Sequence, residues 1–478
     1  MLADTAEEII PAIPEEKRVV DPVAVLELLQ VEYIAGNRTM VQGVQRMPWR
    51  ATLNGDGTVE RRPPLHHSKR LLKAREIART LRARLEEELF EAAKDRARVF
   101  VMLSGGLDSR IVAGVLKRLE PQLQSSIRCV TWGEPKSRDV VYAQRIANWY
   151  DWELIHVPYD APRTWANIER GAVWGGSEVA GLHLHGMEWF RNARPDDLAI
   201  AASFGDSIGR AEFSRRHLSI LRPHLMQNKL GLMHPGLVNR CLPLAERDRR
   251  TAWEGESEAP DWVRYELDMQ ENYMRRMICH AMDYVRQFCS LHQAFTSDAI
   301  VSYMWSLRPD CRTDDVYREL LRDLDSKLYS LPWARTGVAL DGTVESDSSL
   351  RQEYHDWDRW LRQDLRDRLQ PLVLSTGLRE LGAFYWPAVH RVWNKWSRRS
   401  GGSFARRATL VHLASLELSR RHFSLRPCRC RSRGWLGAVA DASRHHLGMP
   451  ARVSRRVLSR SLVLHKRLMV QVLRQQPR

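Results

Sequence analysis

Apolar runs alternate with amphipathic stretches in the first half of the chain. Residues 99–103 are a continuous apolar run that ends at Ser-Gly-Gly, as is typical of a strand buried on both faces of a parallel sheet. The apolar segment 111–116 beyond that turn predicts a helix. Similar patterns predict strands over 126–131, 154–157 and 198–202, and helices over 66–97 and 139–150. We therefore expect an α/β fold with a doubly wound, mainly parallel sheet.

The pattern changes on either side of this region. Residues 1–64 are turn-rich, and Asn54-Gly55-Asp56-Gly57 predicts a β-hairpin. After residue 216 helical patterns prevail, and a Trp-rich stretch predicts a helix-packing core: Trp357, Trp360, Trp386, Trp393 and Trp396. We divide the chain into a short N-terminal region (1–64), an α/β domain (65–230), a mostly helical half (231–426) and a basic tail (427–478).

Composition narrows the class of protein. Hydrophobic residues make up 44% and charged residues 28% of the 478 positions, which excludes disordered, collagen-like and disulfide-framework chains. The cysteines are scattered and odd in number, and the acidic N-terminus has no apolar leader. No apolar run is long enough to span a bilayer. These features predict a reduced, cytoplasmic protein.

The net charge of +16 is unevenly distributed. Nearly all of the excess falls after residue 400, so the main body is close to neutral and the whole-chain charge does not by itself predict nucleic-acid binding. Within the tail, apolar and Arg positions over 452–472 predict a basic amphipathic helix. Such a helix suits an anionic membrane surface or a nucleic acid, and a closing helix with a solvated Arg face fits the same pattern.

The strongest chemical signal is the sequence Ser-Gly-Gly-Leu-Asp-Ser at 104–109, between the buried strand and its helix. Glycines and a helix N-terminus let backbone N–H groups approach an anion, and the two serines add hydroxyl groups. Asp108 would repel a bare phosphate, so its presence predicts a bridging Mg²⁺. The Walker pattern is absent.

This loop resembles the pyrophosphate-binding loop of the N-type ATP pyrophosphatases (the PP-loop family), most closely that of asparagine synthetase-like enzymes. The flanks resemble the same family at Thr131-Trp132-Gly133, Asp139, Ala143, Ile146-Ala147, His156-Val157 and Phe204-Gly205-Asp206. Upstream, Arg38-Thr39, Gly43-Val44 and Met47-Pro48 resemble the end of that family's glutaminase domain, so residues 1–64 are interpreted as a short remnant of a glutaminase-like region.

The resemblance implies an ATP-dependent, amide-forming ligase that adenylates a carboxylate, releases pyrophosphate and lets an amine displace AMP. It implies that Asp108 and Asp206 bind Mg²⁺, although Asp206 would also suit a helix N-cap. It further implies that ATP contacts Leu103, Ser104, Gly105, Gly106, Asp108, Ser109, Val130, Thr131 and Gly205.

The chain also departs from the family. Its first residues are Met1-Leu2-Ala3 rather than a catalytic Cys, so we expect the amine to come from ammonia, a separate glutaminase or an amino-bearing substrate. The second acidic loop, 202–207, lacks both of the family's Glu residues, which argues against aspartate as acceptor. Where the family has a catalytic Lys, Arg318 or Lys327 would have to substitute, alongside Asp108. A small-molecule, peptide or sugar-acid carboxylate is the expected acceptor.

Other interpretations remain open. His183 and His185, at strand spacing near Glu178 and Glu188, would suit a metal site, a substrate loop or plain packing. A PP-loop tRNA-modifying enzyme shares the Ser-Gly-Gly-x-Asp-Ser loop, and an ATP-binding scaffold with degenerate chemistry fits the missing Glu and Lys. The sequence does not specify the oligomeric state.

Overall fold

A computed structural model describes residues 1–63, 66–212, 230–256, 258–345, 347–398 and 404–428. The basic tail beyond residue 428, including its predicted helix, lies outside the described residues. No helix in the described ranges is long and apolar enough to cross a membrane.

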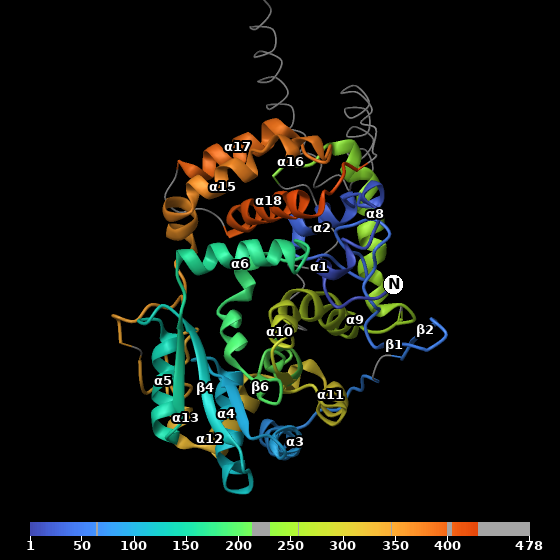
Figure 1. Cartoon of the computed structure of the whole chain (residues 1–478). Helices are drawn as coiled ribbons and strands as arrows, with labels where there is room; N and C mark the ends of the chain where they lie inside the picture. Colours follow the sequence, from blue (N-terminus) through green and yellow to red (C-terminus); the bar gives the residue numbers. More distant parts are fainter. Residues whose placement is uncertain (64–65, 213–229, 257, 346, 399–403, 429–478) are drawn as a thin grey trace, which may run out of the picture.

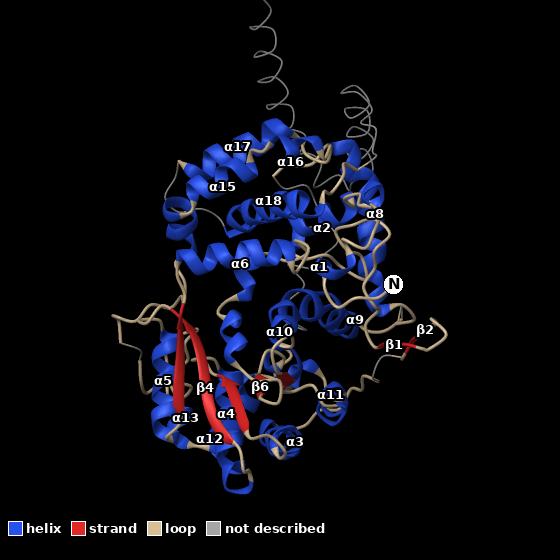
Figure 2. Ribbon diagram, in the orientation of Figure 1, coloured by secondary structure: helices blue, strands red, loops and turns tan. Residues whose placement is uncertain are grey.

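The centre of the α/β region is a parallel five-stranded sheet (Figures 1 and 2). The strands are β3 (Arg98–Met102), β4 (Ser126–Gly133), β5 (Glu153–Pro158), β6 (Leu198–Ala201) and β7 (Ser290–Gln293), in the spatial order β5-β4-β3-β6-β7. The doubly wound, parallel sheet is confirmed. β7 was not predicted, because Ser-Leu-His-Gln has neither an apolar run nor a clear alternation.

The apolar run of β3 is buried on both faces, as its composition predicts. Val99 and Val101 belong to one hydrophobic cluster, whereas Phe100 and Met102 belong to another, because successive side chains of a strand point to opposite faces. The first face is covered by α3 (Ala74–Ala93), α4 (Leu107–Leu119), α5 (Arg138–Tyr150) and α12 (Asp314–Leu324). The second face is covered by η4 (Met187–Asn192) and α10 (Cys279–Val285).

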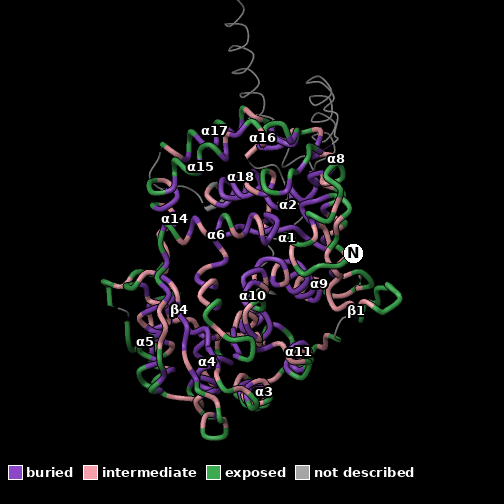
Figure 3. The backbone as a smooth tube through the Cα atoms, viewed as in Figure 1, coloured by how far each residue is buried: buried purple, intermediate pink, exposed green. Residues whose placement is uncertain are grey.

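A largely helical region adjoins the α/β region (Figure 1). Its helices are α2 (Pro22–Val31), α6 (Ala161–Val173), α8 (Pro235–Arg250), α15 (Arg366–Val373), α16 (Thr376–Glu380), α17 (Trp386–Ser397) and α18 (Phe404–Phe423). They share a hydrophobic cluster in which Trp357, Trp360, Trp393 and Trp396 are buried and against which Trp386 packs. Buried residues run along α2 and α18 at the centre of this region (Figure 3). The prediction that the Trp-rich stretch forms a helix-packing core is confirmed.

Shorter elements connect these regions. They are α1 (Ala6–Ile9), the hairpin β1 (Ala51–Leu53) and β2 (Val59–Arg61), η3 (Gly181–Leu184), η5 (Gly205–Gly209), α9 (Asp261–Asp268), η9 (Met269–Ile278), α11 (Asp298–Trp305), α13 (Ser326–Ser330) and α14 (Trp357–Arg359). The antiparallel pairing of β1 with β2 confirms the predicted hairpin.

One local prediction was wrong. The helix expected from residue 66 begins at Ala74, because the amides of Ser68 and Arg70 instead donate to the carbonyls of Trp305 and Ser306 at 3.0 and 3.1 Å. Tertiary contacts override the local pattern there. His183 lies in the 3-10 turn η3, and His185 follows that turn.

Candidate functional site

Two loops emerge side by side at the carboxyl edge of the sheet. The loop 103–106 follows β3 and the loop 202–204 follows β6, and these strands pair directly as parallel neighbours. β3 is also the strand at which the spatial order reverses, since β4 lies on one side of it and β6 on the other. Open α/β sheets bind ligands in the crevice formed at such a point.

The first loop is held by its own hydroxyl groups. The amide of Ser104 donates to the Ser109 hydroxyl at 3.2 Å, and the amide of Gly106 donates to the Ser104 hydroxyl at 3.1 Å. The two hydroxyl oxygens lie 3.1 Å apart. A Cβ on Gly105 would come within 2.8 Å of the Ala334 side chain, so glycine is needed there. The loop therefore presents a small cluster of polar groups in a fixed shape.

The N-terminus of α4 faces the same space. Among the described residues, no side chain caps this helix, whose N-cap is Gly106. Its first amides are left to an external acceptor, and the helix dipole favours a negative one. Behind the loop, fully buried Arg110 donates to the carbonyl oxygens of Gly105, Leu328 and Leu331 at 3.0, 3.0 and 2.7 Å. The anion-binding features that the sequence predicts are thus present and anchored.

The second loop approaches the first at Gly205. A Cβ built on Gly205 would lie 2.3 Å from Asp108 Oδ1, so any larger residue would separate the loops. The Tyr317 hydroxyl donates to the Gly205 carbonyl at 2.7 Å, which ties this loop to α12. Asp206 lies inside the π-helical turn η5, whose N-cap is Phe204, so Asp206 is not a helix N-cap.

A buried cation, Arg210, lies between these acidic groups. Its side chain is 4% exposed, and its Nε lies 3.9 Å from Asp108 Oδ1. Its two terminal nitrogens pair with Glu212 at 3.0 Å and Asp314 at 2.8 Å. The guanidinium also lies 5.4 Å from the ring centroid of Tyr317. Arg210 is therefore the counter-ion around which the second loop and α12 assemble.

Burial and crowding shift the acid–base properties of the carboxyl groups. Burial, followed by the nearby charge of Asp108, raises the pKa of Asp206 to about 8. Burial also raises the pKa of Asp108, although Arg210 opposes the shift. Asp139, which accepts the Gly105 amide at 3.0 Å, has its pKa raised by burial to about 6. Burial therefore favours the protonated form of these carboxyl groups, and a cation bound beside them would favour the ionised form.

These residues fit a magnesium ion that is shared with phosphate. Oδ1 of Asp108 is buried and accepts no hydrogen bond from the described residues. The described ranges contain no group of three or more His, Cys, Asp or Glu suited to a metal. Mg²⁺ commonly uses one or two carboxylates together with substrate phosphates and water, so Asp108 and Asp206 are the residues that would hold it.

The predicted adenine-border residues Val130 and Thr131 are both buried in β4. Leu103, also buried, donates its amide to the Val130 carbonyl at 2.9 Å, so the first loop and β4 are in register. Leu103, Ser104, Gly105, Gly106, Asp108, Ser109, Gly205 and Asp206 all belong to the two facing loops and the helical turns they begin. The structure brings this predicted set together around one edge of the sheet.

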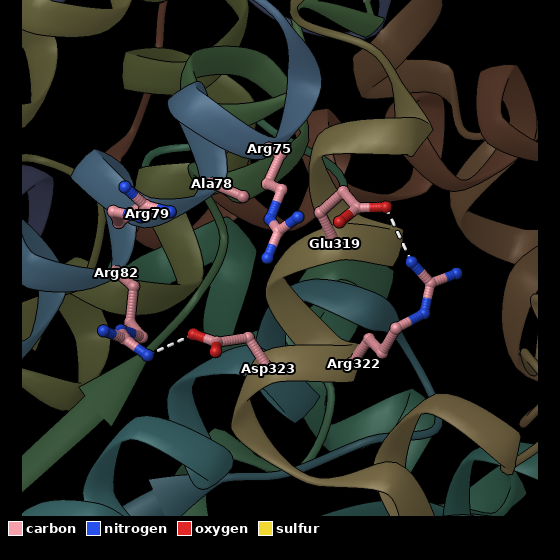
Figure 4. Close-up of a pocket in the computed structure, with 7 residues that line it drawn as sticks. All are labelled: Arg75, Ala78, Arg79, Arg82, Glu319, Arg322 and Asp323. Atoms are coloured by element: carbon pink, nitrogen blue, oxygen red, sulfur yellow. Dashed lines mark hydrogen bonds and ion pairs between the residues drawn. The ribbon is translucent and has the colours of Figure 1, made fainter.

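Arg318 and Lys327 are placed differently. Arg318 pairs with Asp315 at 2.6 Å, and the Lys327 side chain is exposed at the start of α13. No interaction of either side chain with the first loop is found in the described part of the chain. The inner face of α12 carries Asp314 and Tyr317. The outer face of α12 forms a separate groove with α3 (Figure 4). In this groove Glu319 and Asp323 of α12 pair with Arg322 and Arg82, respectively.

Sequence reasoning missed Arg210, Tyr317 and Arg110, and it gave Asp139 no role of its own. Arg210 lies only four positions after Asp206, and a charged residue that close to an acidic loop was an available signal. Tyr317 had no local signal, because its contact joins residues 112 positions apart. The two histidines, His183 and His185, pack in an aromatic cluster with Trp132, Tyr354 and Trp357.

The parallel sheet with its flanking helices is consistent with the fold of the PP-loop family. The family model for asparagine synthase matches residues 80–174, which include β3, the first loop, β4 and β5. This stretch is similar to an asparagine synthase domain, and the match supports an ATP-dependent, carbon–nitrogen ligase kind of activity in general. No curated protein matches the chain.

Proposed function

We propose that this protein is an ATP-dependent ligase that forms an amide through an acyl-adenylate. The observation that carries the proposal is the Ser-Gly-Gly-Leu-Asp-Ser loop with its uncapped α4 N-terminus, facing a second loop that supplies Asp206. Helix amides and hydroxyl groups suit a leaving pyrophosphate, and two carboxylates suit the metal that accompanies it.

The proposed reaction has two steps. A carboxylate oxygen of the acceptor attacks the α-phosphorus of ATP, the bond to the β-phosphate bridging oxygen breaks, and pyrophosphate leaves. An amine nitrogen then attacks the acyl carbon, loses a proton to solvent, and expels AMP by cleavage of the acyl–oxygen bond. The acceptor is a small-molecule, peptide or sugar-acid carboxylate. The amine comes from ammonia, a separate glutaminase or the substrate itself.

The chain's own residues have distinct parts in this proposal. The amides at the start of α4 and the hydroxyls of Ser104 and Ser109 bind and orient the phosphates. Asp108 and Asp206 would hold Mg²⁺, which when bound neutralises phosphate charge. Arg210 holds Asp108 toward the second loop and is the cation that we assign there instead of Arg318 or Lys327.

Exchange of labelled pyrophosphate into ATP, measured across a panel of carboxylic acids without amine, tests the first step. We expect exchange with at least one acid, and a loss of about 100-fold or more in Asp108→Ala, as for removal of one preorganised electrostatic group. Asp315→Ala, which removes an exposed carboxylate two residues from Tyr317, is the matched control and should retain exchange. ATP binding without exchange over the whole panel would instead favour the scaffold interpretation.

A further inference from the structure

A second cavity lies away from the two loops, beside the N-terminal segment. It has a volume of about 740 Å³ and lies between residues 1–14 and the segment 39–50, with Gly176, Glu178 and Arg275 completing its lining. Small-molecule sites commonly fall between 300 and 1,000 Å³ and combine apolar walls with a few converging polar groups. This cavity has both properties.

The walls and the charged groups of the cavity come from different segments. Apolar side chains of both segments line the walls: Ile9, Ile10, Ile13, Met40, Val41, Val44, Met47 and Trp49. The charged lining residues are three arginines and two carboxylates: Arg46 and Arg50 of the 39–50 segment, Arg275 of η9, Glu178 after α6, and Asp4 of the N-terminal segment. A ligand that fits this lining has an apolar body and a charged head.

The charges of this lining are unequal. Glu178 accepts from Arg46 at 2.8 Å and also from buried Arg276 at 3.0 Å, so one carboxylate serves two guanidinium groups. Arg275 donates to the carbonyl of Met47 and to Asn37 Oδ1, and no carboxylate of the described residues lies within ion-pair distance of it. The cavity therefore has an excess of positive charge.

The pKa shifts of these arginines differ. Burial opposes the shift at Arg46, but its pairing with Glu178 raises the pKa of the Arg46 guanidinium. Burial, which outweighs the attraction of Glu271, lowers the pKa of Arg275 to about 10, and Arg46 and Arg61 contribute to the shift. Burial and the charge of Arg46 likewise lower the pKa of Arg276 to about 9. A bound anion would relieve this unfavourable arrangement of buried like charges.

The cavity and the two loops lie on different sides of η9. Tyr273 of η9 and Phe204, which precedes Gly205 and Asp206, pack against the same hydrophobic cluster, and the ring centroids of Tyr273 and Tyr33 lie 5.9 Å apart. Arg275 follows two positions later, about half a helical turn away, and faces the cavity. The two sites are therefore separate but share one helix.

We propose that this cavity binds an amphipathic carboxylate, with its apolar chain against the N-terminal segment and its carboxylate at Arg46 and Arg275. The site is independent of the proposed ligase reaction, because it contains none of the residues that face the first loop. The cavity and the second loop are linked only through packing, since η9 and Phe204 contact the same hydrophobic cluster.

Calorimetric titration of the full chain with sodium octanoate, below its micelle concentration, tests the proposal. We expect saturable binding, at least tenfold weaker binding of octylamine and octanol, and at least tenfold weaker octanoate binding in Arg275→Gln. Ala12→Trp, which places bulk at an exposed wall position, should also weaken binding. Arg308→Gln, at an exposed arginine elsewhere, is the matched control.

Thermal unfolding of each variant shows whether it is folded before binding is compared. Asp108→Ala should bind octanoate like the natural sequence, so failure of the ligase proposal leaves this test intact. Equal affinity for octanoate and octanol, or octanoate affinity unchanged in both Arg275→Gln and Ala12→Trp, would overturn the proposal. Absence of any octanoate binding in the folded natural chain would overturn it as well.

Discussion

The two loops at the carboxyl edge of the sheet are stabilised in opposite ways. The first loop is closed largely by groups within six residues of one another, namely the amides and hydroxyls of Ser104, Gly106 and Ser109. The second loop depends on distant groups, since Arg210 pairs with Asp314 and Gly205 accepts from Tyr317, both more than 100 positions away. One loop is a local motif, whereas the other is a tertiary assembly.

This difference indicates how substitutions would affect each loop. A local motif can be transferred between related chains as a short string, so it is recognisable from sequence. A tertiary assembly can keep its geometry while its residue types change, provided that distant partners change with it. The second loop lacks two Glu residues that the resemblance to asparagine synthetase-like enzymes leads us to expect, yet it still places Asp206 beside the first loop, with Arg210 close to Asp108.

The largest effect is expected from removing the cation that holds the second loop. Arg210→Met would leave Asp108, whose buried Oδ1 accepts no hydrogen bond from the described residues, without its neighbouring cation, and breaking a buried pair costs about 3–5 kcal/mol. Urea unfolding at pH 7 measures this loss. Arg318→Met, at a partly exposed arginine of α12, is the control and should cost less than about 1 kcal/mol. Equal losses of unfolding free energy in the two variants would show that the second loop does not depend on Arg210 as a counter-ion.

A pH-dependent effect is expected at the first loop. The folded-state pKa of Asp139, about 6, lies above the ordinary value of 3.8, so the folded protein binds more protons than the unfolded chain between these values. Stability from this group is therefore present at low pH and is lost as pH rises from about 4 to 6, a difference of about 3 kcal/mol.

Asp139→Asn removes that charge and keeps an oxygen to accept the Gly105 amide. The variant should be more stable than the natural sequence at pH 7, and its excess stability should vanish near pH 4. Chemical unfolding at several pH values measures both. A variant that is less stable at every pH would contradict the assigned role of burial in this shift.

Steric separation of the two loops should have an intermediate effect. In Gly205→Ala the added methyl would overlap Asp108, and overpacking of this kind costs about 1–3 kcal/mol. We expect weaker ATP binding as well, because the first loop would be displaced. Gly55→Ala, in the exposed hairpin turn where an added Cβ meets nothing within 4 Å, is the control. Fluorescence titration with a nucleotide analogue and thermal unfolding distinguish the outcomes.

The smallest effect is expected from one distant hydrogen bond. Tyr317→Phe removes the donor to the buried Gly205 carbonyl and should cost about 1–2 kcal/mol. Tyr329→Phe, which removes a partly exposed hydroxyl beyond the end of α12, should change stability little. If Tyr317→Phe had no effect on stability or on ATP binding, the second loop would not depend on α12 as described.

Much of the fold could be predicted from sequence. Six elements coincide with predicted segments: β3, β4, β5, β6, α4 and α5. Buried parallel strands appear in the sequence as apolar runs, and amphipathic helices appear as apolar positions repeated every three to four residues. β7 could not be predicted, since its four residues become a strand only by pairing with β6. The start of α3 was misplaced for the same reason, as residues 68 and 70 bond to the end of α11.

By itself the sequence determined the parallel α/β fold and the first loop. Both follow from interactions between near neighbours or from runs of apolar side chains, which a linear pattern records. Only the tertiary structure decided which cation lies at the site, because Arg210 acquires its role from Asp108 and Asp314, on either side of it in the chain. It also revealed the cavity beside the N-terminal segment, where Arg46 and Arg275 converge from elements far apart in sequence. Coulomb attraction and burial depend on distance in space, and that distance exists only once the chain has folded.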